Sequence, residues 1–353
     1  MKKIFNISLF IILFIAQSSF SQPDLTGDWQ GTLESGSQKI QIAVRIAEHP
    51  VNNHKAMMRM MRFPGDDNNI PVNSLTIEGS TVKLIINNIG ADFNGEINPD
   101  GDSINGTFSM PGDGMKSVPL ILRRTPYGTA WKDNCLSTRF IEVDKGVKLE
   151  VVDWGGKGKD LVLLAGRRFD AHTFNRIAPK LARNYHVYGI TRRGFGYSSS
   201  PLTGYSPDRL GDDVAAVINA LKLDKPVLAG HSLAGEELTN IGCRYPEKIS
   251  GLVYLDGTYT YQMGLKIVPS VVLSTPVDFI ARDMFTGRDT YTELKIPVLA
   301  MFRQGAYITA EMLKNKVAPS AKIVMLSTPN HFIYIPNEAE VIKEITAFIE
   351  SLP

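Results

Sequence analysis

The 353-residue chain contains little cysteine, only Cys135 and Cys243, and neither sign of charge is in excess. Two cysteines so far apart in the sequence are typical of unpaired thiols, so we predict no disulfide between them, although an exported compartment would permit one. The 38 basic and 36 acidic side chains nearly cancel. The charge balance therefore indicates neither nucleic-acid binding nor attraction to an anionic membrane surface.

Long hydrophobic runs are absent except near the N-terminus, where residues 1–21 have the pattern of a signal peptide. Lys2 and Lys3 precede an apolar run, small residues follow it, and cleavage is expected after Ser21. The run is too short for a typical membrane span, and an uncleaved anchor is the alternative. We therefore expect an exported protein, periplasmic or secreted, with no stable membrane insertion after signal cleavage.

The chain from residue 22 to residue 125 has the rhythm of an all-β domain. Short alternating apolar runs, such as Ile40 to Ile46 and Val82 to Ile86, are separated by turn-forming residues. Aromatic residues stand beside glycines, as in small sheets whose strands bend, and we expect about eight strands in a small barrel or sandwich. Four methionines are interpreted as part of a strand packed on the core, with an adaptable apolar surface as the alternative: Met57, Met58, Met60 and Met61.

Residues 126–138 are interpreted as a linker, and residues 139–353 alternate between strands and helices. A continuous apolar strand is expected from Leu161 to Ala165, and a helix from Thr173 to Arg183. This alternation predicts an α/β domain with a mostly parallel sheet flanked by helices. The active site of such a domain is expected at the carboxyl ends of its strands.

The most informative motif is the segment 230–235, GHSLAG, which follows a short apolar strand and precedes a helix. In the pattern G-x-S-x-G, the turn is so tight that the serine adopts a strained backbone conformation and its neighbours must be small. The turn exposes the serine hydroxyl, and it leaves the first N–H groups of the helix without intrahelical partners. Ser232 is therefore the candidate nucleophile.

The second half of the chain, from Phe140 to Pro353, resembles the α/β-hydrolase family in several motifs that occur in the expected order. They are the strand-end loop at 163–167, the run TRRGFGYS at 191–198, the serine motif, the strand that ends at Asp256, and Asn330-His331-Phe332. The resemblance implies an α/β-hydrolase fold, preceded in this chain by the all-β domain. It also implies a short lid at about residues 257–295.

A serine hydroxyl needs a base within hydrogen-bond distance. By its position in the family pattern, His331 is the expected base. The family's usual position for the acid, in the segment 301–307, holds no carboxylate. Some members of the family place the acid after the preceding strand instead, and the resemblance therefore implies that the acid is Asp256. Glu236 lies one helical turn after Ser232 and is the rival for this role. Two residues are otherwise expected to contact the catalytic residues without touching the substrate: Glu236 and His231.

The resemblance implies that the oxyanion hole consists of the backbone N–H groups of Leu233 and Arg167. Arg167 and Arg168 would then stand near the mouth of the site, with an anionic substrate group or a surface salt bridge as their partner. Arg193 is expected to fix its own loop. His172, in the loop after the strand at 161–165, is interpreted as a capping or surface residue, and an approach to the active site is the alternative.

Together these residues predict an exported serine hydrolase, specifically a carboxylic ester hydrolase that forms an acyl-serine intermediate with a Ser-His-Asp triad. The expected partner is a small-molecule ester or amide substrate, and neither a metal nor an organic cofactor is required. The serine argues against epoxide hydrolases and haloalkane dehalogenases, whose nucleophile in this family is an aspartate. The sequence does not indicate the acyl group, the leaving group or the oligomeric state.

Several alternatives on the same fold remain open: an aminopeptidase or amidase, a lactonase, an acyltransferase, a cofactor-free peroxidase, or a catalytically degenerate ligand-binding protein. An aminopeptidase would need an acidic group to recognise the substrate's amino terminus. The lid region offers three such residues: Asp278, Asp283 and Asp289.

Overall fold

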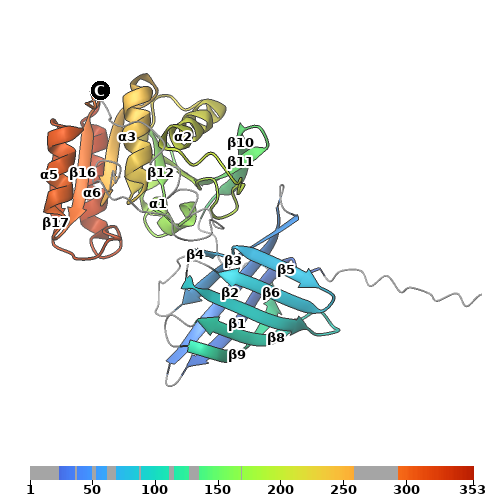
Figure 1. Ribbon diagram of the computed structural model, residues 1–353. Helices are drawn as coiled ribbons and strands as arrows, with labels where there is room; N and C mark the ends of the chain where they lie inside the picture. The colour runs from blue at the N-terminus through green and yellow to red at the C-terminus, as the bar shows by residue number, and fades with distance from the viewer. Residues whose placement is uncertain are drawn as a thin grey trace, which may run out of the picture.

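The strands of the protein form two separate sheets (Figure 1). The computed structural model describes residues 24–35, 38–49, 53–61, 69–86, 89–110, 115–126, 135–167, 169–257 and 293–353. The first sheet has nine antiparallel strands, against the expectation of about eight. The second has eight strands and is mostly parallel. We refer to the two parts as the β domain and, after the active site that the sequence predicts in it, the catalytic domain.

The β domain runs in the strand order β4-β3-β2-β1-β9-β8-β7-β6-β5. Consecutive strands from β1 to β4 and from β5 to β9 pair with one another, as the alternating apolar pattern predicts. Their bounds are β1 (Gly27–Ser35), β2 (Gln38–His49), β3 (Asn53–Met61), β4 (Asn69–Pro71), β5 (Ser74–Glu78), β6 (Thr81–Ile86), β7 (Ala91–Ile97), β8 (Ser103–Met110) and β9 (Met115–Thr125).

The first sheet closes on itself at the connection between β4 and β5, which are its two edges. Only Val72 and Asn73 join these strands; the Val72 N–H donates to Ala56 O of β3 at 3.1 Å, and the Asn73 N–H donates to Ile85 O of β6 at 2.7 Å. A sheet that closes in this way leaves few unpaired edge groups. The β domain is therefore nearly a barrel, as expected.

The interior of the β domain is filled by apolar side chains. Gly95 on β7 lies opposite Gly106 on β8, and a Cβ on Gly106 would lie 2.7 Å from the Gly95 Cα. These two glycines thus let the strands approach beside Phe93, consistent with the pairing of aromatics and glycines in the sequence. Met58 and Met60 belong to this core, whereas Met57 is buried on the opposite face of β3.

The catalytic domain has the strand order β10-β11-β13-β12-β14-β15-β16-β17, in which the hairpin β10-β11 and the pair β11-β13 are antiparallel and the other pairs are parallel. The central strands are short and buried on both faces, as in parallel sheets covered by helices. Their bounds are β10 (Ser137–Asp144), β11 (Val147–Gly155), β12 (Asp160–Leu164), β13 (His186–Ile190), β14 (Val227–His231), β15 (Gly251–Leu255), β16 (Val298–Arg303) and β17 (Lys322–Leu326).

Helices cover both faces of this sheet (Figure 1). One face packs on α2 (Pro207–Leu221), α3 (Ala234–Arg244) and α5 (Tyr307–Lys316) through one apolar cluster. The other face packs on α1 (Ala178–Leu181) and α6 (Glu338–Glu350) through a second cluster. Alternate residues of each strand contribute to the two clusters, for example Leu228 to the first and Ala229 to the second.

Some local predictions were wrong. The helix expected from Thr173 to Arg183 is a 3₁₀ turn, η3 (Ala171–Phe174), followed by the short helix α1. Pro179 explains the break, because proline lacks an N–H and its ring clashes with the preceding helical turn. Helix α5 was not predicted from the sequence. A second 3₁₀ turn, η4 (Pro246–Lys248), precedes β15.

Several predicted segments lie outside the described residues, namely the signal peptide at 1–21 and most of the lid at 257–295. Strand β10 begins at Ser137, inside the stretch interpreted as a linker. Cys135 and Cys243 form no disulfide, as predicted. Among the helices in the described segments, none is long and apolar enough to cross a membrane.

Candidate active site

The turn between β14 and α3 holds Ser232 in a left-handed conformation, with φ of +54°. Such a φ is strained for a residue with a side chain and is typical of functional sites. The turn is tightly packed, because a Cβ on Gly230 would lie 3.0 Å from both Ala234 Cβ and the Leu238 side chain. The Ser232 N–H donates to Leu255 O at 3.2 Å, and this bond ties the turn to the end of β15. The serine is thereby presented at the carboxyl edge of the sheet.

Asp256 directly follows β15 and also has a positive φ, +46°. Its N–H donates to Met301 O at 2.7 Å, which fixes the backbone beside β16. His331 Nδ1 lies 2.5 Å from Asp256 Oδ2. Burial opposes the ionisation of this carboxyl, but the hydrogen bonds from His331 and from the Arg303 N–H outweigh burial and lower the pKa of Asp256 below its ordinary value. Asp256 is therefore a buried carboxylate in contact with the imidazole.

Arg303 is a residue of the site that sequence reasoning missed. Its backbone N–H donates to Asp256 Oδ1 at 3.2 Å, and its Nε donates to Oδ2 at 2.9 Å. It stands at the end of β16, in the segment where the family usually places its acid. The sequence signal for this role was the arginine itself, in a segment that lacks the expected carboxylate. Asp256, the expected acid, is thus held by a cation at the end of the neighbouring strand.

His331 lies in the loop between β17 and α6, and its side chain is 40% exposed. Because the ring donates from Nδ1 to Asp256, the tautomer that fits this contact leaves a lone pair on Nε2, as a general base requires. Among the described residues, no hydrogen bond involves Ser232 Oγ. Hydrogen bonds between catalytic groups are often long without a bound substrate.

His231, the residue before Ser232, holds the His331 loop against the serine turn. Its Nε2 donates to the backbone oxygen of His331 at 3.0 Å, and the two imidazole rings lie 4.6 Å apart. Burial, and then the neighbouring His331 charge, lowers the pKa of His231 to about 3, so the ring is neutral. His231 thus packs against His331 and bonds to the backbone of its loop.

Glu236, the rival acid, lies in the first turn of α3 and is buried. The carboxylate that contacts His331 is Asp256. The geometry therefore favours Asp256 over Glu236 as the partner of the imidazole.

The loop after β12 lies against the serine turn at Gly166. A Cβ on this residue would lie 3.0 Å from Ser232 Cβ and 2.9 Å from His231 Nδ1. Helical bonding in α3 starts with the Gly235 N–H, which donates to Ser232 O, so the Leu233 N–H precedes the helical pattern. Arg167 follows Gly166 and its side chain is exposed. The two expected oxyanion donors thus belong to segments that meet at Ser232.

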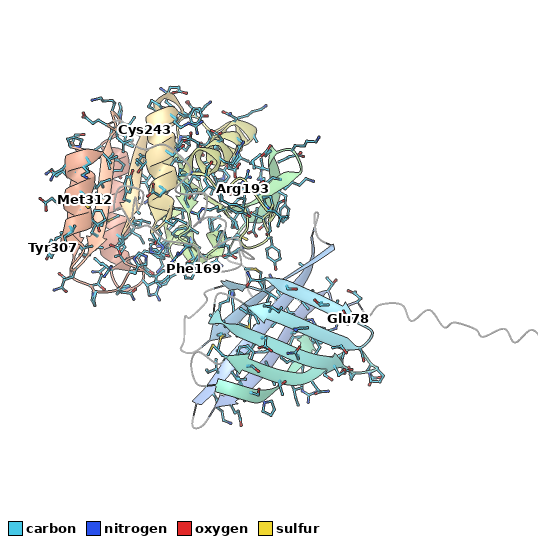
Figure 2. The ribbon with its side chains drawn as sticks, in the orientation of Figure 1. Glu78, Phe169, Arg193, Cys243, Tyr307 and Met312 are labelled. Carbon is cyan, nitrogen blue, oxygen red and sulfur yellow. The ribbon has the colours of Figure 1, made fainter. Side chains whose placement is uncertain are left out.

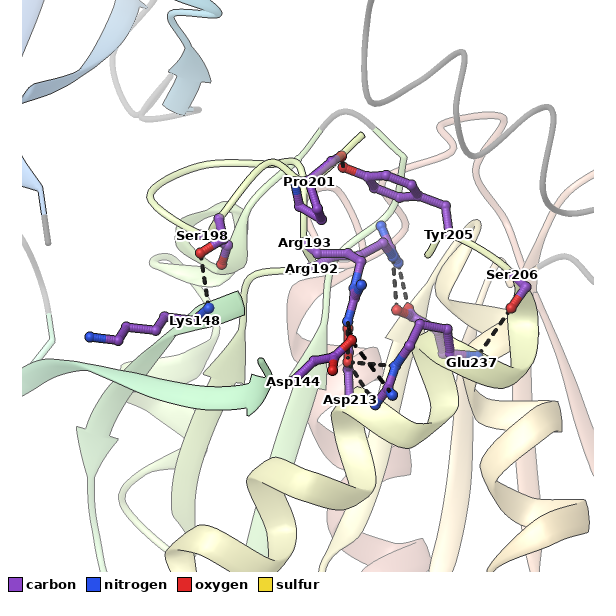
Figure 3. Close-up of polar contacts among 12 residues, drawn as sticks. Asp144, Lys148, Arg192, Arg193, Ser198, Pro201, Tyr205, Ser206, Asp213 and Glu237 are labelled. Atoms are coloured by element: carbon purple, nitrogen blue, oxygen red, sulfur yellow. Dashed lines mark hydrogen bonds and ion pairs between the residues drawn. The ribbon is translucent and has the colours of Figure 1, made fainter. Parts of the chain in front are cut away.

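Arg192 and Glu237 form a buried ion pair (Figure 3). It anchors the loop after β12, which carries the expected oxyanion donor and which we call the oxyanion loop. Arg192 donates to Ala165 O at 2.8 Å and to Gly166 O at 3.3 Å, and its Nε donates to Glu237 of α3 at 2.8 Å. Burial raises the pKa of Glu237, and the Arg192 guanidinium counteracts this effect. A single arginine therefore joins the loop after β12 to the helix that follows the nucleophile.

Arg193, unlike its neighbour Arg192, binds helix α2: it donates to both carboxylate oxygens of Asp213, at 2.6 and 2.7 Å (Figure 3). This contact confirms that Arg193 fixes its own loop, which it ties to α2. The interpretation of His172 was wrong, because its ring is buried and contacts Glu150 at 3.0 Å. The charged neighbour could not be identified from the sequence, since Glu150 lies on β11, far away in the chain.

Some residues of the sequence-based hypotheses lie outside the described residues: Arg168, Asp278, Asp283 and Asp289. Over the described part of the chain, no cluster of three or more His, Cys, Asp or Glu side chains is arranged to hold a metal ion.

Comparison with known proteins defines the fold. Residues 161–301 match the model of the alpha/beta hydrolase fold family. An esterase from Exiguobacterium antarcticum has a similar structure, with a TM-score of 0.51 and 18% identity, covering 61% of this chain and all of that one. The second domain therefore has the α/β-hydrolase fold.

Two curated relatives are enzymes with hydrolase names. The pimeloyl-acyl-carrier-protein methyl ester esterase of Aeromonas hydrophila is 35% identical over 135 residues, which are 37% of this chain and 44% of that protein. The fluoroacetate dehalogenase of a Burkholderia species is 31% identical over 134 residues, which are 36% of this chain and 41% of that protein. Each alignment thus spans less than half of the relative's length.

Proposed function

We propose that the protein is an exported serine hydrolase that cleaves carboxylic esters of small molecules through an acyl-serine intermediate. The observation that carries the proposal is the contact between Asp256 and His331 at 2.5 Å, beside a serine with φ of +54°. A buried carboxylate that holds the Nδ1–H of a histidine leaves Nε2 free to accept the serine proton. The similarity to a methyl ester esterase supports the choice of an ester.

In the proposed reaction, Ser232 Oγ attacks the ester carbonyl carbon while His331 Nε2 takes the hydroxyl proton. The N–H groups of Leu233 and Arg167 stabilise the oxyanion. The imidazolium is stabilised by Asp256, and it then donates its proton to the leaving alcohol. A water molecule, deprotonated by His331, hydrolyses the acyl-serine and regenerates the enzyme.

Replacement of the nucleophile tests this mechanism directly. S232A is expected to lower kcat toward p-nitrophenyl acetate by about 10⁴-fold or more, because the remaining groups supply only binding and oxyanion stabilisation. A fluorophosphonate probe should label the wild-type protein at Ser232 and leave S232A unlabelled. Ester hydrolysis by S232A at the wild-type rate would rule the mechanism out, and an unlabelled wild-type protein would favour a degenerate ligand-binding domain.

A substrate panel separates ester hydrolysis from the other reactions of this fold. p-Nitrophenyl esters, lactones and aminoacyl p-nitroanilides, assayed with the mature protein, should give the highest kcat/KM for esters. A preference for aminoacyl amides would instead identify an aminopeptidase or amidase. Acyl transfer to an added alcohol in excess of hydrolysis would identify an acyltransferase.

A further inference from the structure

The outer face of β2 and β3 is buried, although the inner face of these strands already forms the core of the β domain. Side chains of a strand alternate between its two faces. Val44 and Met58 point into the core, whereas the alternate residues Ala43, Met57 and Arg59 are only 1%, 0% and 6% exposed. A second body must therefore cover this outer face, which we call the docking face and define by Ala43, Arg45, Met57 and Arg59.

The covering group includes Tyr197 of the catalytic domain, which packs against Ala43 and Met57. Tyr197 belongs to the turn at 191–199, and the turn is firmly held. Ser198 Oγ donates to Thr191 O at 2.6 Å, and the Gly194 N–H donates to Ser199 O at 2.7 Å. The tyrosine is therefore presented to the β domain by a rigid support.

The same turn packs against Asp170, which follows the oxyanion loop. A Cβ on Gly196 would lie 2.8 Å from Asp170 Cβ. Asp170 is buried and accepts a hydrogen bond from the His172 N–H at 3.1 Å. Burial raises the pKa of Asp170 to about 7; the charges of His172 and of Arg59 oppose this rise, and that of Glu150 adds to it. Arg59 of the docking face is thus close enough to act electrostatically on a carboxyl four residues after Gly166.

The carboxyl edge of the catalytic sheet faces the β domain. Phe169, in the loop after β12, lies on the side of the catalytic domain nearest to the β domain (Figure 2). Its ring contacts that of Phe332, the neighbour of His331, with the ring centres 5.0 Å apart. The docking face therefore lies next to the loops that carry the proposed oxyanion donor and base.

We propose that the docking face holds the β domain permanently against the turn at 191–199 and that the docked β domain forms one wall of the active-site entrance, where it limits the length of the acyl group. The docking itself is independent of the reaction. The effect on the acyl group rests on the proposed ester hydrolase function. The partner of the docking face is thus the catalytic domain of the same chain.

A double-mutant cycle between Met57 and Tyr197 tests the docking without any assay of activity. M57A and Y197A, each in the full chain, should lower the melting temperature. The melting temperature of the double variant should be no lower than that of the more damaging single variant, because both substitutions remove the same contact. Additive shifts would show that the two side chains do not interact, and they would overturn the docking.

The dependence of kcat/KM on the length of the substrate's acyl chain tests whether the β domain forms a wall of the entrance. For M57A and R59M, the ratio of kcat/KM for p-nitrophenyl octanoate to that for p-nitrophenyl acetate should rise about tenfold over wild type, because a loosened wall admits longer acyl groups. R59K should keep most of the wild-type profile. R123M is the matched control, since Arg123 is an exposed arginine on β9 of the same domain.

Equal octanoate-to-acetate ratios of kcat/KM in R59M, M57A and R123M would show that the β domain does not limit the acyl group. This conclusion would hold even if the double-mutant cycle shows that Met57 and Tyr197 interact. If the wild-type protein hydrolyses no ester in the series, the proposed function fails, and the double-mutant cycle still decides whether the domains dock. The two proposals can therefore fail separately.

Discussion

The two domains differ in where they bury polar side chains. In the described part of the β domain, four polar or charged residues are buried: Asp28, Arg45, Arg59 and Ser103. In the described part of the catalytic domain there are nineteen, among them His231, Glu237 and Asp256. Three of the four in the β domain lie on β1, β2 and β3, and two of these belong to the docking face.

This difference indicates which parts of the molecule do more than maintain a fold. Burying a charge costs free energy unless it is paired and hydrogen-bonded, so a domain without a site has little reason to do it. The β domain has an almost wholly apolar interior and places its buried ions on the side that meets the catalytic domain. Apart from Asp153, the catalytic domain gathers its buried ions around the loops at the carboxyl edge of its sheet. We therefore expect chemistry in one domain and control of access from the other.

The largest expected effect is the loss of the acid at Asp256. D256N should lower kcat by about 10⁴-fold, because an amide cannot hold the imidazole in the required tautomer or stabilise its charged form. The measurement is kcat toward p-nitrophenyl acetate. D153N is the matched control, since Asp153 also contacts a histidine, His186, at 3.0 Å, but at the amino end of β13. Equal losses in both variants would remove Asp256 from the triad.

Arg303 offers a way to move the acid back to its usual place in the family. In the D256N background, R303D should recover part of the lost kcat, whereas R303N should not. Recovery would show that the β16 end can still supply the acid. A failure of R303D to exceed R303N would mean that the loop has adapted to Asp256 alone.

The second effect concerns the stability of the β domain, in which no catalytic residue is expected. Trp29 is fully buried and donates from Nε1 to Leu25 O at 3.0 Å. W29A should lower the free energy of unfolding of the β domain by about 3–5 kcal/mol through cavity formation. Calorimetry of the full chain would measure this, with I121A as the exposed control in the same sheet. A stability equal to that of wild type would contradict the assignment of Trp29 to the core.

A smaller effect is expected at Gly166, where the oxyanion loop meets the nucleophile. G166A would bring a methyl group within 3.0 Å of Ser232 Cβ, so the loop must shift away from the serine. We expect kcat to fall by about 10- to 100-fold with little change in KM, because the oxyanion donors act mainly in the transition state. G305A, at a strained but open position after β16, is the control. A fall in both variants by the same factor would point to general strain.

The smallest expected effect is a shift in acid stability. The pKa of Asp256 lies below its ordinary value of 3.8, so its ionised form stabilises the fold above that pH and the contribution is lost as the pH falls through the folded pKa. R303M removes one hydrogen bond and a charge, and should move the midpoint of acid unfolding upward by a few tenths of a pH unit, since Arg303 is partly exposed. An unchanged or lower midpoint would contradict the role of Arg303.

Much of this molecule could be predicted from the sequence, because the relevant signals are local. The alternating runs before residue 125 predicted the antiparallel sheet, and the strand and helix alternation after residue 139 predicted the parallel one. The G-x-S-x-G turn at Ser232 needs only a tight strand-to-helix connection, which its glycines reveal. The break at Pro179 was overlooked, although the proline itself was visible.

Other features depend on contacts between residues that are distant in the chain. Arg303 was missed because its role depends on Asp256, and His172 was misread because its partner Glu150 lies on another strand. The buried pairing of Arg192 with Glu237 was also invisible, since either residue alone fits a solvated surface.

The sequence by itself determined two kinds of domain, a serine at a strained turn, and a histidine in a late loop. Only the tertiary structure brought Asp256 to the imidazole, Arg303 to Asp256, and the docking face to Tyr197. The physical reason is that backbone propensities and turn chemistry act over a few residues, whereas hydrogen bonds, burial and charge interactions depend on which strand ends and loops the fold brings together.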